Sequence, residues 1–174
     1  MKAKHWITAC APALANNEAS VTDFFGTYPD GRLIQVLQDP STWYLSAKHH
    51  RKSAWTGKST EQFLDLWCLS TEGMLRNRAR YGDRVIIVRF EDLMGETETT
   101  MAALARELSL AFDPVLLKPT FNGQPIRTNS SFAVEGPGLL DAPLKRNKML
   151  TRSEQELIKH RCGSTYEKAL AASI

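Results

Sequence analysis

The sequence predicts an α/β protein in which a parallel sheet is flanked by helices. Short apolar strand patterns alternate with longer helical patterns along the 174 residues, and this order implies crossover connections between parallel strands. The strand patterns contain unbroken aliphatic runs, such as VIIV at 85–88, which are typical of strands buried on both faces. The length and the hydrophobic content of 43% suit one domain, residues 1–174, with a substantial core.

The first two predicted strands lie early in the chain. The first covers residues 4–10, KHWITAC, and Pro12 follows shortly after it. A short helical pattern and a turn at 29–31 then lead to the second strand, residues 32–37. Its residues are apolar apart from Gln35, so we expect this strand to be buried on both faces except at Gln35.

Two helices are predicted between the second strand and the third. For the shorter helix, Asp39 is a suitable N-cap and Pro40 is a suitable first residue. The longer helix covers residues 59–81, where apolar side chains recur with a helical period. Ser59 and Gln62 match a capping box at its start.

The rest of the chain begins with the third predicted strand, residues 84–89, in the pattern RVIIVRFEDL. An amphipathic helix follows at 96–110, with acidic residues in its first turn. Residues 115–148 are rich in glycine and proline, and we expect a loop-rich segment that covers the cofactor or substrate. The last element is a helix that Thr151 or Ser153 caps.

Charge and composition exclude several classes of protein. The net charge of +3, from 22 basic and 19 acidic residues, is too small to indicate a nucleic-acid partner. No run approaches the roughly 18 apolar residues of a membrane span, and the start lacks the apolar core of a signal peptide, so we expect a cytoplasmic protein. Cys10, Cys68 and Cys162 are far apart and match no metal-ligand spacing, which indicates free or buried thiols and no metal site.

The segment from Gln38 to Ser46 follows the second predicted strand and begins a helix. In open α/β sheets, ligands bind at the carboxyl ends of the strands, and helix N-termini there attract anions. The Ser46 hydroxyl could donate a hydrogen bond to a phosphate, with charge from the basic run at 48–51. The alternative is that Ser46 packs within the helix and that the basic run is a solvated face. The residues alone leave both interpretations open.

Four segments in order resemble the sulfotransferases that use 3′-phosphoadenosine 5′-phosphosulfate (PAPS), especially those of the bacterial type. They are RLIQVLQDPSTWYLSAKHH at 32–50, VRFEDLMGETETTMAALAREL at 88–108, FNGQPIRTNSSF at 121–132 and LTRSEQELIKHRCGSTYEKAL at 150–170. The resemblance implies an architecture related to P-loop kinases and the transfer of a sulfuryl group from PAPS to a hydroxyl or amine. The acceptor would be a small molecule or a carbohydrate, and no metal would take part.

The resemblance also implies roles for individual residues. In the family, an arginine at a strand end and a serine eight residues later bind the 3′-phosphate, and Gln38 and Ser46 occupy these positions. Phe90 is a candidate neighbour of the adenine, and the alternative is that Phe90 is a core residue. In the family, an acidic residue after this aromatic residue fixes the local backbone. The segment at 121–132 resembles the part of the family that closes over the nucleotide, and the alternative is an ordinary surface loop. It contains the remaining candidates for phosphate or ribose contacts: Arg127, Asn129, Ser130 and Ser131.

Gln38 departs from the family pattern, because glutamine has no charge and cannot form a bidentate contact with phosphate. A charge-assisted hydrogen bond contributes about 1.5–3 kcal/mol, so its loss would weaken cofactor binding by about one to two orders of magnitude. Lys48 or Arg51 could compensate for the missing charge.

A second departure concerns the family's Gly-x-x-Arg-Ser/Thr-Gly-Thr-Thr loop, which cradles the 5′-phosphosulfate and has no match in residues 1–31. We therefore expect the chain to correspond to the C-terminal portion of the family fold, truncated at its N-terminal side. Activity of this chain alone is doubtful, and none of the histidines falls in a family motif for the catalytic base.

Two other functions compete with this interpretation. The first is a catalytically inactive, sulfotransferase-like binding or interaction module. The second is a nucleotide kinase, which is disfavoured because no Gly-x-x-x-x-Gly-Lys-Ser/Thr motif is present. A strand missing from the sheet would leave edges unpaired, and a homodimer is a plausible consequence.

Overall fold

The computed structural model describes residues 16–50, 56–121, 124–125 and 149–174. Its elements, in chain order, are α1 (Glu18–Thr27), β1 (Leu33–Leu37), α2 (Pro40–Lys48), α3 (Thr60–Tyr81), the 3-10 turn η3 (Gly82–Arg84), β2 (Val85–Arg89), α4 (Phe90–Gly95), α5 (Thr97–Glu107), the 3-10 turn η4 (Pro114–Leu117), β3 (Thr120–Phe121), β4 (Gln124–Pro125) and α6 (Arg152–Ala171). The predicted helices and the second and third predicted strands are therefore confirmed. The predicted strand at 4–10 lies outside the described residues.

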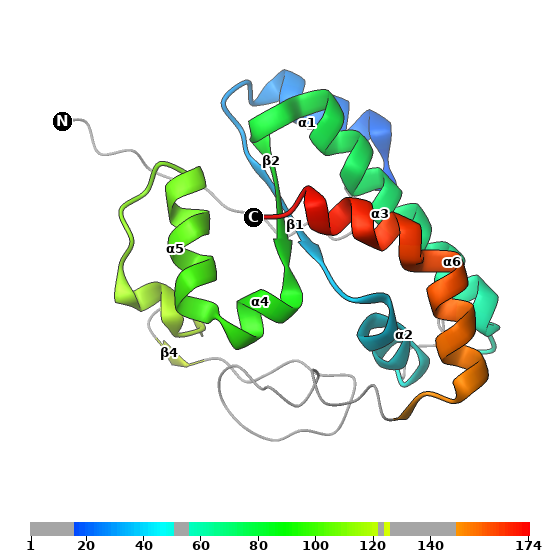
Figure 1. The fold of residues 1–174 in the computed structure, drawn as a ribbon. Coiled ribbons are helices and arrows are strands. Elements are labelled where there is room, and N and C mark those ends of the chain that lie inside the picture. The colour runs from blue at the N-terminus through cyan, green and yellow to red at the C-terminus, as the bar shows by residue number, and fades with distance from the viewer. Residues whose placement is uncertain (1–15, 51–55, 122–123, 126–148) are drawn as a thin grey trace.

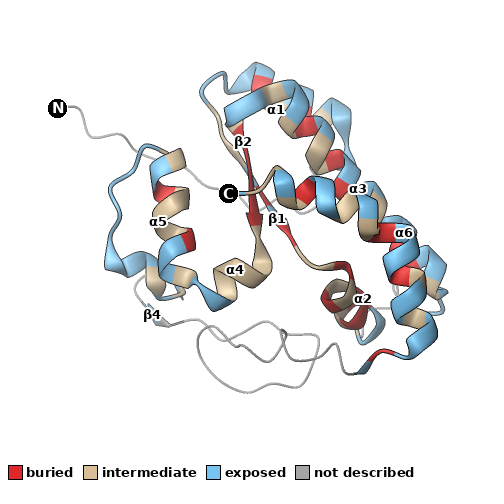
Figure 2. Cartoon of the chain, in the orientation of Figure 1, coloured by how far each residue is buried: buried red, intermediate tan, exposed pale blue. Residues whose placement is uncertain are grey.

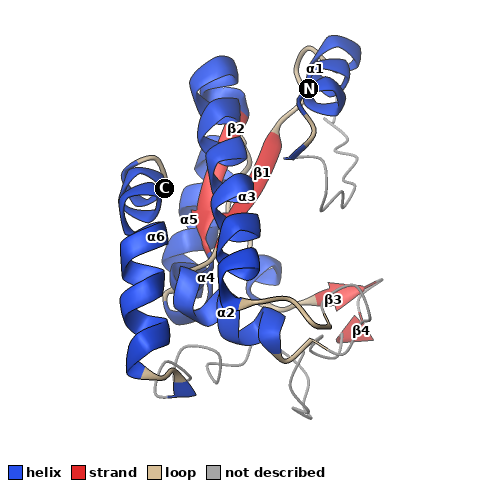
Figure 3. Cartoon of the chain, turned by 90° about the vertical axis from the view of Figure 1, so that its right-hand side faces the viewer, coloured by secondary structure: helices blue, strands red, loops and turns tan. Residues whose placement is uncertain are grey.

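The main sheet consists, among the described residues, of the parallel strands β1 and β2. Leu33 pairs with Val85 and Leu37 with Arg89, so the two strands end at the same level. Helices α3 and α6 lie on one side of the strands, and α5 with the short α4 lies on the other (Figure 1). This arrangement confirms the predicted class, a parallel sheet flanked by helices. The antiparallel pair of β3 and β4 lies apart from β1 and β2 (Figure 3).

The helices begin where local capping chemistry predicts. The Asp39 carboxylate caps α2, and Ser59 forms a reciprocal capping box with Gln62 at the start of α3. Of the two candidates for the last helix, Thr151 is the cap, and it forms a second capping box with Glu154. These contacts satisfy backbone N–H groups that no helical carbonyl can reach.

The burial of residues 34–36 of β1 is the reverse of the prediction, whereas Leu37 is buried as predicted. Gln35 is only 5% exposed, whereas Ile34 and Val36 are 43% and 47% exposed. Side chains alternate between the two faces of a strand, and Gln35 shares its face with Leu37, which belongs to the core beside α3 and α6. On the other face, α5 contacts β2, which is largely buried (Figure 2). Val88 of this strand is only 1% exposed. The outer face of β1 is exposed because no described residue covers it.

The third strand ends at the predicted residue, and a short helix follows it directly. β2 ends at Arg89 and Phe90 begins the helix α4. Glu91 and Asp92 then fall in the first turn of a helix, where the helix dipole favours acidic side chains. Within the pattern RVIIVRFEDL, the strand therefore ends at Arg89 and the helix begins at Phe90.

The main core lies between β1, β2 and the helices α2, α3 and α6. It is built largely from buried aliphatic and aromatic side chains, with one thiol among them: Leu37, Tyr44, Leu45, Phe63, Leu64, Trp67, Ile87, Ile158 and Cys162. A smaller cluster of Val21, Phe25 and Val85 packs α1 against the start of β2. Among the described residues, no helix has the length and apolar character to cross a membrane.

Candidate functional site

The candidate site lies where β1 and β2 end side by side. Leu37 and Arg89 are partners in the register, and each strand is followed directly by a helix, α2 after β1 and α4 after β2. The carboxyl ends of parallel strands are the usual position of ligands in open α/β sheets. The three candidate residues that the structure describes, Gln38, Ser46 and Phe90, lie in these connections or in the helices that follow.

The first turn of α2 is held by its own N-cap. The Asp39 Oδ1 atom accepts hydrogen bonds from the backbone N–H groups of Ser41 and Thr42, at 2.8 and 3.2 Å. These two donors are the ones that a helix N-terminus would otherwise offer to an anion. A phosphate near α2 would therefore depend on side chains rather than on these N–H groups.

Glu91 connects the end of β2 to the segment after β1. Its Oε1 atom accepts hydrogen bonds from the backbone N–H of Asp39 and from the Thr42 hydroxyl, both at 3.0 Å. The side chain is 12% exposed, so water competes little for these bonds. The resemblance implies an acidic residue that fixes the local backbone. The hydrogen bond from the Asp39 N–H group gives Glu91 a contact of this kind.

Arg89 lies among acidic and polar neighbours. Its Nη1 atom donates to Asp92 Oδ1 at 3.0 Å, and its Nε atom lies 3.6 Å from Glu91 Oε2. Burial by itself would lower the pKa of the guanidinium, but Tyr166, Asp92 and Glu91 together raise it above its ordinary value, so Arg89 is cationic. Three buried polar atoms here have no hydrogen-bond partner among the described residues: Arg89 Nε, Glu91 Oε2 and Tyr166 Oη. The Arg89 and Glu91 atoms face each other as an ion pair at 3.6 Å, and a water or a polar ligand would complete the hydrogen bonding of all three.

Trp67 supports Gln38 from α3. Its Nε1–H group donates to the Gln38 carbonyl at 3.0 Å, and its ring meets Tyr166 of α6 edge-on, with centroids 6.0 Å apart. From the sequence, Trp67 is one apolar residue of a long helix, and Tyr166 has no assigned role. A buried tryptophan requires an acceptor for its N–H group, but this signal does not identify the acceptor.

Ser46 lies in the second turn of α2 and is half-buried. With a rise of 1.5 Å per residue, its Cα lies about 9 Å along the helix axis from that of Pro40. Gln38 precedes the helix, and its side chain is also half-buried. A single phosphate that contacts both residues must therefore lie along the side of α2 rather than at its N-terminus.

Lys48 forms an ion pair with α6. Its Nζ atom donates to Glu154 Oε1 at 2.8 Å, and the Tyr44 hydroxyl donates to the same oxygen at 2.8 Å. The bond from Lys48 is the largest cause that lowers the pKa of Glu154 to about 2, and it also raises the pKa of Lys48. Lys48 could replace the missing arginine only if this ion pair opened.

The remaining site residues divide into two groups. Phe90, the first residue of α4, is half-buried at the end of β2. This position is compatible both with a neighbour of the adenine and with a core residue. The others lie outside the described residues: Arg51, Arg127, Asn129, Ser130 and Ser131. The structure therefore brings Gln38, Ser46 and Phe90 to one end of the sheet and does not test the others.

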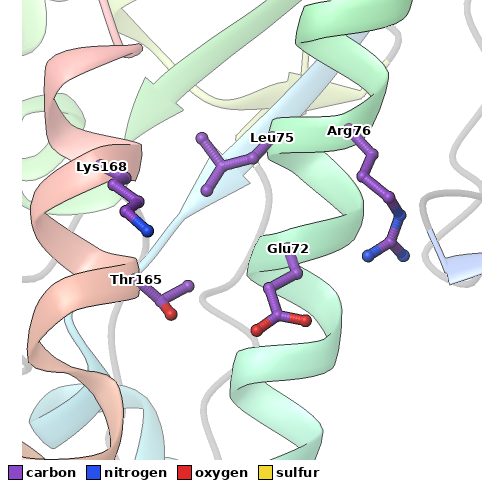
Figure 4. Close-up of a pocket in the computed structure, with 5 residues that line it drawn as sticks. All are labelled: Glu72, Leu75, Arg76, Thr165 and Lys168. Carbon is purple, nitrogen blue, oxygen red and sulfur yellow. The ribbon is translucent and has the colours of Figure 1, made fainter.

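A separate hollow of about 350 Å³ lies between α3 and α6 (Figure 4). Its lining comes from both helices and consists of Glu72, Leu75, Arg76, Thr165 and Lys168. None of the nucleotide-binding candidates lines it. Within the described ranges, no three histidine, cysteine or acidic side chains come together as a set of metal ligands.

Comparisons with known proteins agree with the arrangement of the strands and helices. A family model described as "Sulfotransferase family" matches residues 4–114. A sulfotransferase domain from the curacin biosynthetic pathway has a TM-score of 0.64 at 14% identity, covering 88% of this chain and 60% of that domain's chain. A sulfotransferase domain from the Synechococcus PCC 7002 olefin synthase has a TM-score of 0.62 at 15% identity, covering 86% and 55%. No curated protein matches the sequence.

Proposed function

The chain belongs to the sulfotransferase family, and on that premise we propose that it binds the adenosine 3′-phosphate portion of PAPS at the carboxyl ends of β1 and β2. The observation that carries this proposal is the hydrogen bond from the Asp39 N–H group to Glu91, which holds the segment from Gln38 to Ser46 against the end of β2. A segment held in this way loses less conformational freedom when a ligand binds.

The 3′-phosphate would lie along the side of α2. There the Ser46 hydroxyl and the Gln38 amide are its hydrogen-bond donors, and Phe90 lies beside the adenine. This position leaves the Asp39 cap intact, so binding does not require the N-terminus of α2 to rearrange. The unpaired polar atoms of Arg89, Glu91 and Tyr166 support a polar ligand at the same end of the sheet.

The affinity of this site is expected to be modest. Gln38 carries no charge, and Lys48 is already paired with Glu154. A neutral donor contributes about 0.5–1.5 kcal/mol, whereas a charge-assisted bond contributes about 1.5–3 kcal/mol. The protein would therefore bind the nucleotide more weakly than a relative with arginine at this position.

The reaction that accompanies such a site is sulfuryl transfer from PAPS to a hydroxyl or amine. A base takes the proton of the acceptor, and cationic groups stabilise the charge on the transferring group. The chain spans 60% and 55% of the two solved sulfotransferase domains that it resembles, and no residue of this chain is assigned as the base. Its own proposed part is to hold the adenosine 3′-phosphate.

A catalytically inactive binding module is the second candidate function, and the glutamine at position 38 is the observation that favours it. For either function, we propose that the acceptor or ligand is a small molecule or a carbohydrate rather than a nucleic acid. The proposed location of the protein is the cytoplasm. We also propose a homodimer, because Ile34 and Val36 expose apolar surface on β1.

Calorimetric titration of the purified chain with adenosine 3′,5′-bisphosphate tests the binding proposal, and AMP serves as a ligand that lacks the 3′-phosphate. We expect micromolar binding of the bisphosphate that AMP does not reproduce. Ser46→Ala should weaken it by about three- to tenfold, as expected for one lost hydrogen bond. Ser164→Ala, at an exposed position on α6, should leave the affinity unchanged. Failure of the bisphosphate to bind at millimolar concentration would overturn the proposal.

A further inference from the structure

Two of the three cysteines meet in the core between α3 and α6. Cys68 and Cys162 are 94 positions apart in the sequence, yet their Sγ atoms lie 3.6 Å apart. The two helices pack side by side (Figure 1), and Cys68 also donates a hydrogen bond to the Arg161 carbonyl of α6 at 3.7 Å. The sequence predicts unrelated thiols, because only the fold brings these two positions together.

We propose that Cys68 and Cys162 form a reversible disulfide that joins α3 to α6. A disulfide has an S–S distance of about 2.05 Å, so the two sulfur atoms need to approach by about 1.5 Å. Rotation of the side chains and a small shift of the helices would have to supply this movement. The proposal concerns a covalent modification and does not depend on the binding of a nucleotide.

The different exposures of the two thiols give them different roles in the reaction. Cys68 is half-buried and reaches the surface, whereas Cys162 has 0% exposure. A peroxide as the oxidant first converts the Cys68 thiol to a sulfenic acid and leaves as an alcohol or water. The Cys162 thiol then attacks the Cys68 sulfur, an S–S bond forms, and water leaves. Overall, two thiols lose two hydrogen atoms while one peroxide O–O bond is reduced.

This reaction should be slow at neutral pH and faster in alkaline solution. Burial is the main cause that raises the pKa of both thiols above the ordinary range. The thiolate is the reactive form, so little of either cysteine is reactive near neutrality. The pair is therefore a site that responds to sustained oxidation rather than a rapid peroxide sensor.

The bridge would brace residues that support the candidate site. Trp67, which bonds to the Gln38 carbonyl, precedes Cys68 directly, and Tyr166 lies one helical turn after Cys162. The rings of Trp67 and Tyr166 are in contact. Closing the bridge therefore restrains both helices at the level where they meet the ends of the strands.

The test uses the full chain with Cys10→Ser, so that Cys68 and Cys162 are its only thiols. After treatment with hydrogen peroxide at about pH 9, we expect the intact mass to fall by two hydrogen atoms. A non-reducing peptide map should join the peptides that contain Cys68 and Cys162. The unfolding midpoint should rise by about 5–10 °C, and dithiothreitol should reverse the change.

Two variants in the same background serve as controls. Cys68→Ser should show neither the mass change nor the shift of the midpoint, and it removes the less buried thiol. Cys162→Ala tests the other partner. If Cys162→Ala does not fold, Cys68→Ser alone is a sufficient control. The proposal is overturned if peroxide gives sulfinic acid at Cys68 without a cross-link, or if the linked peptides come from two chains.

Discussion

The carboxylate of Glu91 accepts a hydrogen bond from the backbone N–H of Asp39 at 3.0 Å and so joins the N-cap of α2 to the start of α4. The two residues are 52 positions apart, and the same Glu91 oxygen also accepts the Thr42 hydroxyl. One acidic side chain thus determines how the first turn of α2 is placed relative to the end of β2.

Glu91→Ala should lower the free energy of unfolding by about 1–3 kcal/mol, because it leaves the partly buried Asp39 N–H group without an acceptor. Glu91→Gln keeps an acceptor oxygen and should cost about 1 kcal/mol. Urea denaturation measures both values. In a double-mutant cycle, Glu91→Ala and Thr42→Val should couple by at least about 0.5 kcal/mol. Strict additivity would mean that the Thr42 contact does not form in solution.

Gln38→Arg should restore the charge that the family places at this strand end. We expect adenosine 3′,5′-bisphosphate to bind about tenfold more tightly, because a charge-assisted contact replaces a neutral one. The gain should shrink as salt is added, since the new attraction is electrostatic. Gln38→Met, which has a similar length and no charge, is the matched control for calorimetry. Equal affinities for the two variants would place the 3′-phosphate elsewhere.

The ionisation of Glu154 should make the free energy of unfolding depend on pH in the acidic range. Its pKa of about 2 in the folded protein lies below the ordinary value of 4.5, so its contribution is complete above about pH 4.5. The contribution is lost as the pH falls from 4.5 toward 2. Glu154→Gln keeps the capping box of α6 but removes this titration.

The measurement is the difference in unfolding free energy between the native chain and Glu154→Gln as a function of pH. At neutral pH the native chain should be more stable by about 1–2 kcal/mol, since Lys48 is half-exposed and solvent screens part of the pairing. The difference should disappear near pH 2. A difference that stays constant between pH 6 and pH 2 would show that Glu154 is not paired in solution.

Local chemistry in the sequence predicts much of this fold but little of its long-range contacts. The Asp39 cap and the Ser59 capping box depend on residues two or three positions away, and both predictions are confirmed. The contacts of Glu91 with Asp39 and of Cys68 with Cys162 depend on the packing of distant elements, which no local pattern contains. The burial of Gln35 was missed for the same reason.

Val36 and Val88 offer a matched test of the exposed face of β1. They are partners in the register, but Val36 is 47% exposed and Val88 only 1%. In the monomer, Val36→Thr should change the free energy of unfolding by no more than about 0.5 kcal/mol. Val88→Thr should cost about 1–3 kcal/mol, because it buries a hydroxyl without a partner. Thermal and urea unfolding at low protein concentration measure both costs.

If the proposed homodimer forms, the loss of stability caused by Val36→Thr should depend on the protein concentration. A second chain against the exposed face of β1 would cover Val36, so Val36→Thr should weaken self-association and become more costly as the protein concentration rises. The cost at Val88 should not change, because this side chain is already buried within one chain. Sedimentation velocity at several concentrations measures the association directly. A high cost at Val36 that is independent of concentration would instead mean that another part of the same chain covers it, and the homodimer would be rejected.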